Sequence, residues 1–405
     1  MQHLVIVGGG FAGLWAALVA AREAIHHGRE LNVTLVSRDS FLTLRPRLYE
    51  RDPESLRTAL LPVLQPVGVN LMVGTVVQID SHAKSLEIAT PEGARLLRYD
   101  RLILATGSRL KTPDIPGLAE HGWSIDDYEA AIDFDAHLRD VTRTSEAPGH
   151  NCFVVLGAGF TGIELATELR SRIEAHGGSE TAAGARVVMI DRNDAVGATL
   201  GANPRPVIED ALKNARIETR LGATVRAVDE QAVHLGSGER IETRSVISTA
   251  GLQASPLAGL LPVERDEVGR LPTDAMLRVE GMNGVYAAGD IARAYVDEQN
   301  LAPMSCQHAL FMGRAAGFNA SHDLLGLPLR PYRQPQYVTC LDLGASGAVF
   351  TRGWEREVAM TGDEAKKLKR YINCERIYPP QGDRAAILAA ADIDAREDIK
   401  SAKAS

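Results

Sequence analysis

The chain has 405 residues, a length that predicts two or three domains. Hydrophobic residues make up 45% of the chain and charged residues 24%, which is ordinary for a soluble globular protein. The formal net charge of −8 gives no general attraction to nucleic acid, so we expect no nucleic-acid partner.

The N-terminal residues MQHLVIVGGG predict a strand that leaves no room for a signal peptide, so we expect a cytoplasmic protein. Residues 4–21 contain no charge and are long enough to raise the question of a membrane span. Three successive glycines, Gly8 to Gly10, divide this run into a short strand and a helical piece. The pattern therefore indicates a buried strand, a turn and a helix.

The same unit occurs twice along the chain. Each copy opens with an apolar strand, a GxGxxG turn and a helix, at residues 4–18 and 153–169. Each copy continues with a second strand (33–37 and 186–191) and closes with an apolar strand that runs into a turn of small residues (101–108 and 245–252). Features that recur in one order are stronger evidence for two related domains than any single motif.

The segments between and after these units have their own patterns. The small, polar stretch at residues 176–184 predicts a surface loop, and a helix is expected to start at Ser124, with Asp127 in a capping-box-like position. Residues 337–341 and 345–350 predict a hairpin that turns near Gly344. The basic stretch at residues 363–372 predicts an exposed helix.

Glycines at this spacing suit the pyrophosphate of a dinucleotide. A helix N-terminus offers unpaired N–H groups and the positive end of its dipole. Gly8 permits the tight turn, Gly10 lets the backbone approach the phosphates, and Gly13 lets the helix pack close to the strand. Gly157, Gly159 and Gly162 are expected to do the same in the second unit. The alternative is a tight strand–helix turn that binds nothing.

The residue that ends the second strand usually contacts the adenosine ribose. In the second unit this residue is Asp191, whose charge repels a 2′-phosphate and favours NADH, although Arg192 directly after it could accept NADPH. In the first unit the equivalent residue is Ser37, and Arg38 or Asp39 could supply the missing contact. The alternative for Asp191 is an exposed turn residue.

Taken together, the two units, the sequence ATGS at residues 105–108 and the sequence AAGDIA at residues 287–292 resemble the FAD/NAD-linked two-dinucleotide-binding-domain reductases over about residues 1–325. The resemblance implies that the first unit holds FAD and the second holds the nicotinamide cofactor. It also implies that Asp290 bonds the ribityl–phosphate region, where Asp290 could in addition cap a following helix. The expected cofactor-binding residues are Gly8, Gly10, Phe11, Ala12, Gly13, Ser37, Arg38, Val77, Ala105, Thr106, Gly107, Gly157, Gly159, Gly162, Asp191, Gly251, Gly289, Asp290 and Gln307.

The expected fold class is α/β, with two Rossmann-like dinucleotide-binding domains and a small C-terminal α+β domain. We expect residues 1–112 and 256–325 to form the two parts of the FAD-binding domain. Residues 113–255 are expected to form the NAD(P)-binding domain, and residues 326–405 the C-terminal domain.

The positions of the cysteines exclude the branches of this family that use a redox-active thiol. The four cysteines form no CxxC pair, none lies where related disulfide reductases carry their redox thiols, and no metal-ligand spacing with histidine occurs. We therefore expect no metal site and no thiol relay. His26 and His27, at the end of the first helix, are interpreted as a solvated turn rather than metal ligands.

Further stretches resemble type II NADH dehydrogenases, the single-subunit NADH:quinone reductases. Residues 44–50 (LRPRLYE) are similar to their QPLLYQ, and residues 248–257 (STAGLQASPL) to their WTAGVRASPL. Residues 353–358 (GWEREV) and 369–380 (KRYINCERIYPP) resemble their C-terminal region. Their AQxAxQ motif, which borders the flavin and the quinone, matches residues 306–311. In this motif Gln307 matches the first glutamine, whereas Phe311 replaces the second. In residues 44–50, Arg47 replaces a leucine of QPLLYQ.

Two residues are the predicted catalytic groups. Glu164, expected in the first turn of its helix, would orient the nicotinamide or relay a proton; the alternative is a carboxylate stabilised only by the helix dipole. Gln307 would bond the flavin or the acceptor, with a structural amide as the alternative. Glu168, one turn after Glu164, is interpreted as structural.

The leading functional hypothesis is an enzyme that passes hydride from NADH to FAD and electrons on to a quinone-type acceptor. Alternatives are a soluble NAD(P)H reductase for another small acceptor or an electron-carrier protein, a sulfide:quinone reductase, and a non-enzymatic flavin-bearing protein. The basic run at residues 366–370 could contact an anionic membrane surface, which would place the protein peripherally on the inner face. A homodimer is left open.

Overall fold

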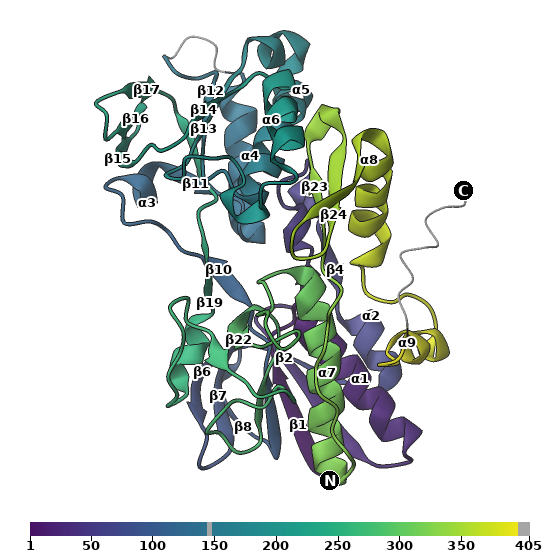
Figure 1. The fold of residues 1–405 in the computed structure, drawn as a ribbon. Helices are drawn as coiled ribbons and strands as arrows, with labels where there is room; N and C mark the ends of the chain where they lie inside the picture. The colour runs from purple at the N-terminus through teal and green to yellow at the C-terminus, as the bar shows by residue number, and fades with distance from the viewer. Residues whose placement is uncertain (144–147, 396–405) are drawn as a thin grey trace.

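A computed structural model describes residues 1–143 and 148–395 of the chain (Figure 1). Two parallel sheets form two lobes, and a smaller antiparallel sheet near the C-terminus packs beside the second lobe (Figure 1). The expected α/β fold class with two Rossmann-like sheets is confirmed. Across 1–143 and 148–395, no helix combines the length and the apolarity that crossing a membrane requires.

The first lobe is built on a five-stranded parallel sheet in the order β21-β9-β1-β2-β5. Its central strand β1 has four successive buried residues, Leu4 to Val7, because helices and loops cover both faces of the sheet. The strands are β1 (Gln2–Val7), β2 (Leu31–Ser37), β5 (Asn70–Val73), β9 (Arg101–Leu104) and β21 (Val285–Ala287). The last strand comes from a distant part of the chain, so this lobe is assembled from two segments.

The second lobe repeats this plan in the order β11-β18-β12-β13-β14. Its central strand β12 is buried throughout, as β1 is almost throughout. The strands are β11 (Gly122–Ser124), β12 (Cys152–Leu156), β13 (Arg186–Ile190), β14 (Ile217–Arg220) and β18 (Ser245–Ser248). The helices of this lobe are α3 (Leu118–His121), α4 (Tyr128–Val141), α5 (Phe160–Gly184) and α6 (Arg205–Asn214).

The chain crosses between the lobes twice, and the two crossing segments pair with each other. Strands β10 (Ser108–Leu110) and β19 (Leu252–Ala254) lie together between the lobes (Figure 1). They run antiparallel, with Arg109 opposite Gln253. These crossings lie close to residues 112 and 255, where we place the boundaries between the domains.

Each lobe also carries smaller elements outside its main parallel sheet; among them, β20 and β22 pair parallel and the other strands pair antiparallel. The first lobe carries β3 (Phe41–Thr43) paired with β4 (Arg57–Ala59), the short helix α2 (Leu61–Leu64), and a sheet of β6 (Thr75–Asp80), β7 (Ser85–Thr90) and β8 (Gly93–Arg98). It also carries β20 (Leu271–Pro272) beside β22 (Ala292–Arg293). The second lobe carries β15 (Val225–Asp229), β16 (Ala232–Leu235) and β17 (Arg240–Glu242).

The predicted C-terminal hairpin is present. Strands β23 (Val338–Asp342) and β24 (Ala348–Arg352) pair antiparallel around Gly344, and β25 (Glu357–Thr361) extends the sheet. Helix α8 (Gly362–Tyr371) packs on this sheet, a π-helical turn (Ile372–Arg376) follows it, and α9 (Arg384–Ala390) lies against α1. Helix α8 was expected to be exposed, but its Leu368 and Lys369 are buried, so only part of its surface faces solvent.

Two details of the second lobe correct the sequence analysis. Residues 176–184 do not form a surface loop but continue α5, with a single break at Gly178 (φ 82°, ψ 171°). Ala182 and its neighbours are compatible with a helix, and Arg170 holds the carbonyls of Ala182 and Ala185. Helix α4 begins at Tyr128 rather than at Ser124; Asp127 caps it by accepting from the Ala130 N–H at 3.0 Å.

The two segments of the first lobe meet where α1 (Phe11–His26) packs against α7 (Cys306–Leu325), side by side in Figure 1. Two glycines of α7 allow this approach. A Cβ atom at Gly313 would lie 2.2 Å from the carbonyl oxygen of Ala12, and one at Gly317 would lie 2.3 Å from that of Ala16. The contact is therefore backbone against backbone.

We expect Gly313→Ala to destabilise the protein, although alanine favours a helix by about 1 kcal/mol over glycine. The added methyl group forces α1 and α7 apart, and such overpacking typically costs about 1–3 kcal/mol. Thermal denaturation should show a lower midpoint for this variant. Gly259→Ala is the control, because its nearest neighbouring atom outside its own backbone lies 3.7 Å away; an equal loss in both variants would contradict the explanation.

Candidate active site

The first glycine turn joins β1 to α1. At Gly8 (φ +117°) a Cβ atom would lie 2.3 Å from the Ala105 carbonyl oxygen, and at Gly13 it would lie 1.8 Å from the carbonyl oxygen of Gly8. A Cβ at Gly10, by contrast, would meet nothing within 4 Å, and no described side chain caps the helix that begins beside it. The turn is therefore closely packed where Gly8 and Gly13 face neighbouring backbone, and it leaves free space beside Gly10 at the helix N-terminus. A pyrophosphate site requires such space.

Residues at the ends of neighbouring strands lie beside this turn. Ala105, Thr106 and Gly107 follow β9, and the buried Thr106 hydroxyl has no hydrogen-bond partner within the described residues. Such an orphaned hydroxyl fits a polar ligand. Ser37, at the end of β2, is buried beneath the turn, where a Cβ at Gly9 would lie 2.3 Å from its Oγ.

The remaining expected flavin contacts are more scattered. Phe11 and Ala12 open α1, Arg38 is exposed directly after β2, and Val77 on β6 is 49% exposed. Gly289 approaches two other segments, since a Cβ there would lie 3.1 Å from that of Ala12 and 3.4 Å from that of Ala309 on α7.

Asp290 is largely buried, with 13% of its side chain exposed, and it does not cap a helix as expected from the sequence. Its segment, Gly289–Ile291, is a single 3-10 turn followed by strand β22. The carboxylate instead accepts a hydrogen bond from the Ser108 hydroxyl at 2.6 Å, and burial raises its pKa above the ordinary range. Ser108 belongs to the ATGS sequence, so two motifs far apart in the sequence meet here.

Arg45 links the two lobes at this place, which the sequence did not reveal. It pairs with Asp126 from the second lobe, its Nη1 donates to the Ser108 hydroxyl at 2.9 Å, and it lies 3.9 Å from Asp290. Asp126 also accepts from the Leu110 N–H at 2.6 Å. The arginine thus fixes the crossing strand β10 beside the first glycine turn.

The second glycine turn has the same geometry. At Gly157 (φ +112°) a Cβ would lie 2.8 Å from Thr249 Oγ1, and at Gly162 it would lie 2.0 Å from the Gly157 carbonyl oxygen. A Cβ at Gly159 would meet nothing within 4 Å, and among the described residues no side chain caps α5. This turn too leaves room at a helix N-terminus.

Asp191 follows β13 and touches this second turn. Its Oδ2 accepts from the Ala158 N–H at 2.6 Å, while Oδ1 accepts from the Asn193 N–H at 2.8 Å. Gly251, which follows β18, adopts a left-handed conformation (φ +64°). Ser248, the last residue of β18, has a buried hydroxyl for which the described residues offer no partner.

Glu164 has a partner that the sequence analysis missed. Because α5 begins at Phe160, Glu164 is its fifth residue and lies past the first turn, where the helix dipole is weaker than expected. Its carboxylate lies 2.8 Å from Nζ of Lys369 on α8, and it accepts from the Asp342 N–H at 3.0 Å. Both side chains are almost fully buried, with 4% of Glu164 and 7% of Lys369 exposed.

Burial controls the protonation of this pair. Desolvation raises the pKa of Glu164 to about 7, while Lys369 and the Asp342 N–H act in the opposite direction. Glu164 in turn holds the pKa of Lys369 above its ordinary value against the effect of burial. A carboxyl group with a pKa near neutrality can both hold and release a proton at physiological pH.

Gln307 lies at the N-terminus of α7. Ser305 caps this helix, and Gln307 is its second residue and half-buried. Burial is the main cause that raises the pKa of its neighbour Cys306 to about 11; Asp290 and Glu164 act in the same direction, and Lys369 acts against them. The first turn of α7 is therefore within electrostatic range of both Asp290 and the Glu164–Lys369 pair.

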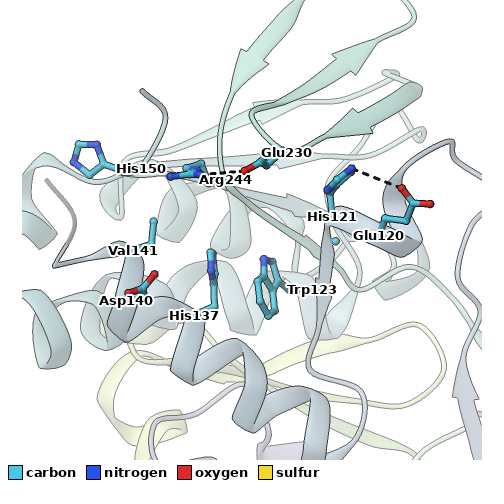
Figure 2. A pocket seen from close by; sticks show the side chains of 10 residues that line it. Glu120, His121, Trp123, His137, Asp140, Val141, His150, Glu230 and Arg244 are labelled. Carbon is cyan, nitrogen blue, oxygen red and sulfur yellow. Dashed lines mark hydrogen bonds and ion pairs between the residues drawn. The ribbon is translucent and has the colours of Figure 1, made fainter. Parts of the chain in front are cut away.

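A separate cavity of about 380 Å³ lies in the second lobe (Figure 2). It is at the amino ends of β11, β12 and β18, the edge opposite to the second glycine turn. Trp123 and His137 stack in it with ring centroids 4.2 Å apart. None of the predicted site residues lines it.

The sequence alone gave little sign of Arg45, Asp342 or Lys369. Arg45 and Lys369 do fall within the stretches LRPRLYE and KRYINCERIYPP that carry the family resemblance. That signal could have singled them out, but not shown which partner each one meets.

Lys369→Met tests the buried ion pair through its effect on stability. Removing one partner of a buried pair typically costs about 3–5 kcal/mol, because the other charge stays buried. Without Lys369 the pKa of Glu164 rises further above its unfolded value, so the folded state binds the proton more tightly. The loss should therefore be larger at about pH 8.5 than at about pH 6, where Glu164 is neutral.

Urea or thermal unfolding at both pH values measures this difference. Lys367→Met is the matched control, because Lys367 lies on the same helix and is exposed. An equal loss for Lys369→Met at both pH values would contradict a buried carboxylate as its cause.

Comparison with known proteins agrees with this geometry. The model of the pyridine nucleotide-disulphide oxidoreductase family matches residues 2–313. An NADH dehydrogenase-like protein of Mycobacterium tuberculosis is 46% identical over 396 residues, covering 96% of this chain and 98% of that protein. A type II NADH:quinone oxidoreductase of Staphylococcus epidermidis is 26% identical over 406 residues, covering 93% and 95%. The solved structure of NDH2 from Plasmodium falciparum has the same fold, with a TM-score of 0.77 and 14% identity over 96% of this chain and 97% of that one.

These findings confirm the resemblance drawn from the two glycine turns and from the ATGS and AAGDIA sequences. They also confirm the prediction of an oxidoreductase, with type II NADH:quinone reductases among its relatives. The family model spans more than half of the chain, and a relative above 30% identity covers nearly all of it. The chain belongs to the pyridine nucleotide-disulphide oxidoreductase family.

Proposed function

We propose that this protein is an FAD-dependent oxidoreductase that takes hydride from NADH and passes electrons to a quinone-type acceptor. The observation that carries the proposal is the pair of uncapped helix N-termini, α1 and α5, each opened by a glycine turn with free space beside Gly10 or Gly159. Two such ends suit two dinucleotides. The names of the mycobacterial and staphylococcal relatives support this choice of chemistry.

In the first lobe, the Gly8–Gly13 turn would hold the FAD pyrophosphate. The orphaned Thr106 hydroxyl and the largely buried Asp290 carboxylate would bond the flavin and ribityl parts. Bound FAD would supply the redox chemistry, accepting hydride and releasing electrons to a second substrate. The protein contributes the rigid support, because Arg45 and Ser108 hold Asp290 in place.

In the second lobe, the Gly157–Gly162 turn would hold the pyrophosphate of the nicotinamide cofactor. Asp191 lies against this turn, and its negative charge there would favour NADH over NADPH, because it would repel a 2′-phosphate. Arg192 is the reason why NADPH is kept as a weaker alternative.

The electrons must leave without a thiol relay. All four cysteines are free thiols, and desolvation raises the pKa values of Cys152, Cys306 and Cys340, so these three thiols ionise poorly. Quinone reduction consumes protons together with electrons. Glu164, buried and ionisable near neutral pH, is suited to hold such a proton, and Lys369 keeps its carboxylate in place.

A reductase for another small acceptor is the second candidate. Phe311 stands where the resembled quinone reductases have their second glutamine, and it packs partly buried against the core. An apolar ring on this face of α7 removes a hydrogen bond that a quinone oxygen would use. Peripheral membrane contact and a homodimer remain part of the proposal; of the basic run, Lys367 and Arg370 are exposed, whereas Lys369 is buried against Glu164.

The experiment that tests the proposal is anaerobic reduction of the purified protein by NADH or NADPH, followed by reoxidation with quinones, sulfur compounds and carrier proteins. We expect a yellow protein that NADH bleaches faster than NADPH, and that a soluble quinone reoxidises fastest. A colourless protein that takes up no flavin would end the proposal. Fast reoxidation by another acceptor alone would select the second candidate.

Gln307→Ala should separate the two half-reactions. Loss of a hydrogen bond to the acceptor should slow reoxidation by quinone about tenfold or more, while reduction by NADH stays nearly unchanged. Stopped-flow absorbance of the flavin measures both rates. Gln299→Ala, an exposed glutamine, is the control; equal slowing of both half-reactions in Gln307→Ala would refute the assignment.

Glu164→Gln should remove a pH dependence from the same reoxidation step. In the unmodified protein the rate should fall as pH rises through about 7, because the neutral, proton-donating form of Glu164 is lost. The amide of Gln cannot donate this proton, so reoxidation of the variant should be about a hundredfold slower. Its rate should not change with pH across this range. Glu168→Gln, one turn further along α5, should keep the pH dependence; its loss there as well would argue against Glu164.

A further inference from the structure

Three side chains with metal-binding atoms meet where α1 and α7 end. Glu23 and His27 lie one turn apart at the C-terminal end of α1, and His322 lies in the last turn of α7. Their ligand atoms are all within 4.8 Å of one another. Figure 1 shows the two helices side by side, so the cluster joins both segments of the first lobe.

The distances are close to those of a tetrahedral metal site. Nε2 of His322 lies 3.1 Å from Oε2 of Glu23, and Nε2 of His27 lies 3.8 Å from the same oxygen. Ligands about 2.1 Å from a tetrahedral zinc ion are about 3.4 Å apart. His27 is exposed, so its ring can move to reach the same ion as the other two ligands.

The hydrogen bonds of His322 point to a cation. Its Nδ1 lies 2.7 Å from the carbonyl oxygen of Pro328, which can only accept, so Nδ1 carries the proton. Its Nε2 faces the Glu23 carboxylate, a second acceptor. A ring between two acceptors needs either a second proton or a metal ion, and a backbone carbonyl on the far nitrogen is the usual support for a metal-bound histidine.

The surroundings hold this arrangement in place. The His322 ring contacts the Phe318 ring, with the centroids 3.7 Å apart and the planes tilted by 30°, and it is largely buried. Arg22 donates to the other carboxylate oxygen of Glu23, Oε1, at 2.6 Å, and it also pairs with Asp392. The C-terminal, negative ends of two helix dipoles meet here, which favours a cation.

We propose that Glu23, His27 and His322 form a zinc(II) site, with water as the fourth ligand. The site would tie the end of α1 to the end of α7 and so hold together the two segments of the first lobe. Helix α1 is 16 residues long, so the site lies about 24 Å from the glycine turn at its other end. Its role is therefore structural and independent of the proposed redox function.

His27 was interpreted from the sequence, with His26, as a solvated turn and not as a metal ligand. The pair of adjacent histidines alone offers too few ligands for a metal ion. The further ligands are Glu23, one helical turn before His27, and His322, on a helix almost three hundred residues later.

Metal binding by the purified, tag-free full chain tests the proposal. After treatment with a chelator, the protein is titrated with zinc chloride by calorimetry and melted with and without zinc. We expect one zinc ion per chain and a melting midpoint raised by about 2 °C or more at saturating zinc. His27→Ala should weaken zinc binding about tenfold or more, whereas His26→Ala should leave it unchanged within about twofold.

Both histidines of this comparison are exposed, so neither variant endangers the fold. Glu23→Gln is a second variant that weakens binding if the carboxylate is a ligand, and its circular dichroism spectrum checks folding. The proposal is overturned if the unmodified chain binds no stoichiometric zinc. It is equally overturned if His26→Ala weakens binding as much as His27→Ala, which would indicate adventitious binding by surface histidines.

Discussion

The close approach of a helix to the strand before it is the constraint on which this structure depends. In both lobes the first turn of the helix packs directly against the backbone of the glycine turn, where Gly13 and Gly162 leave no room for a Cβ atom. This packing aims the free N–H groups of α1 and α5 outward, beside Gly10 and Gly159. Close contact on one side of each turn and free space on the other side are what make it suitable for a phosphate.

The C-terminal region completes the candidate site rather than merely following it. Helix α8 brings Lys369 to Glu164 of the second lobe, and the neighbouring hairpin contributes Asp342. A buried ion pair is expensive to desolvate, so it is weak evidence for stability. Its position within electrostatic range of Cys306, next to Gln307, is better explained by proton handling. This is why we assign Glu164 a catalytic role in the proposed function.

The first lobe faces a different problem, because its sheet is assembled from two segments of the chain. Strand β21 joins the sheet beside β9, and α7 then packs on α1 through Gly313 and Gly317. These backbone contacts involve Ala12 and Ala16, in the first half of α1. At the C-terminal ends of the two helices, the side chains of Glu23 and His322 contact each other instead. The proposed zinc ion would act at this point.

The sequence by itself determined the repeated strand–turn–helix units, the family and the class of chemistry. These follow from local patterns, because buried strands and glycine spacing are set by neighbours in the chain. Only the tertiary structure decided that residues 176–184 continue α5, that Ser108 bonds Asp290, and that Glu164 meets Lys369. Side-chain partners of this kind depend on how distant segments pack, and no local pattern of residue types encodes that packing.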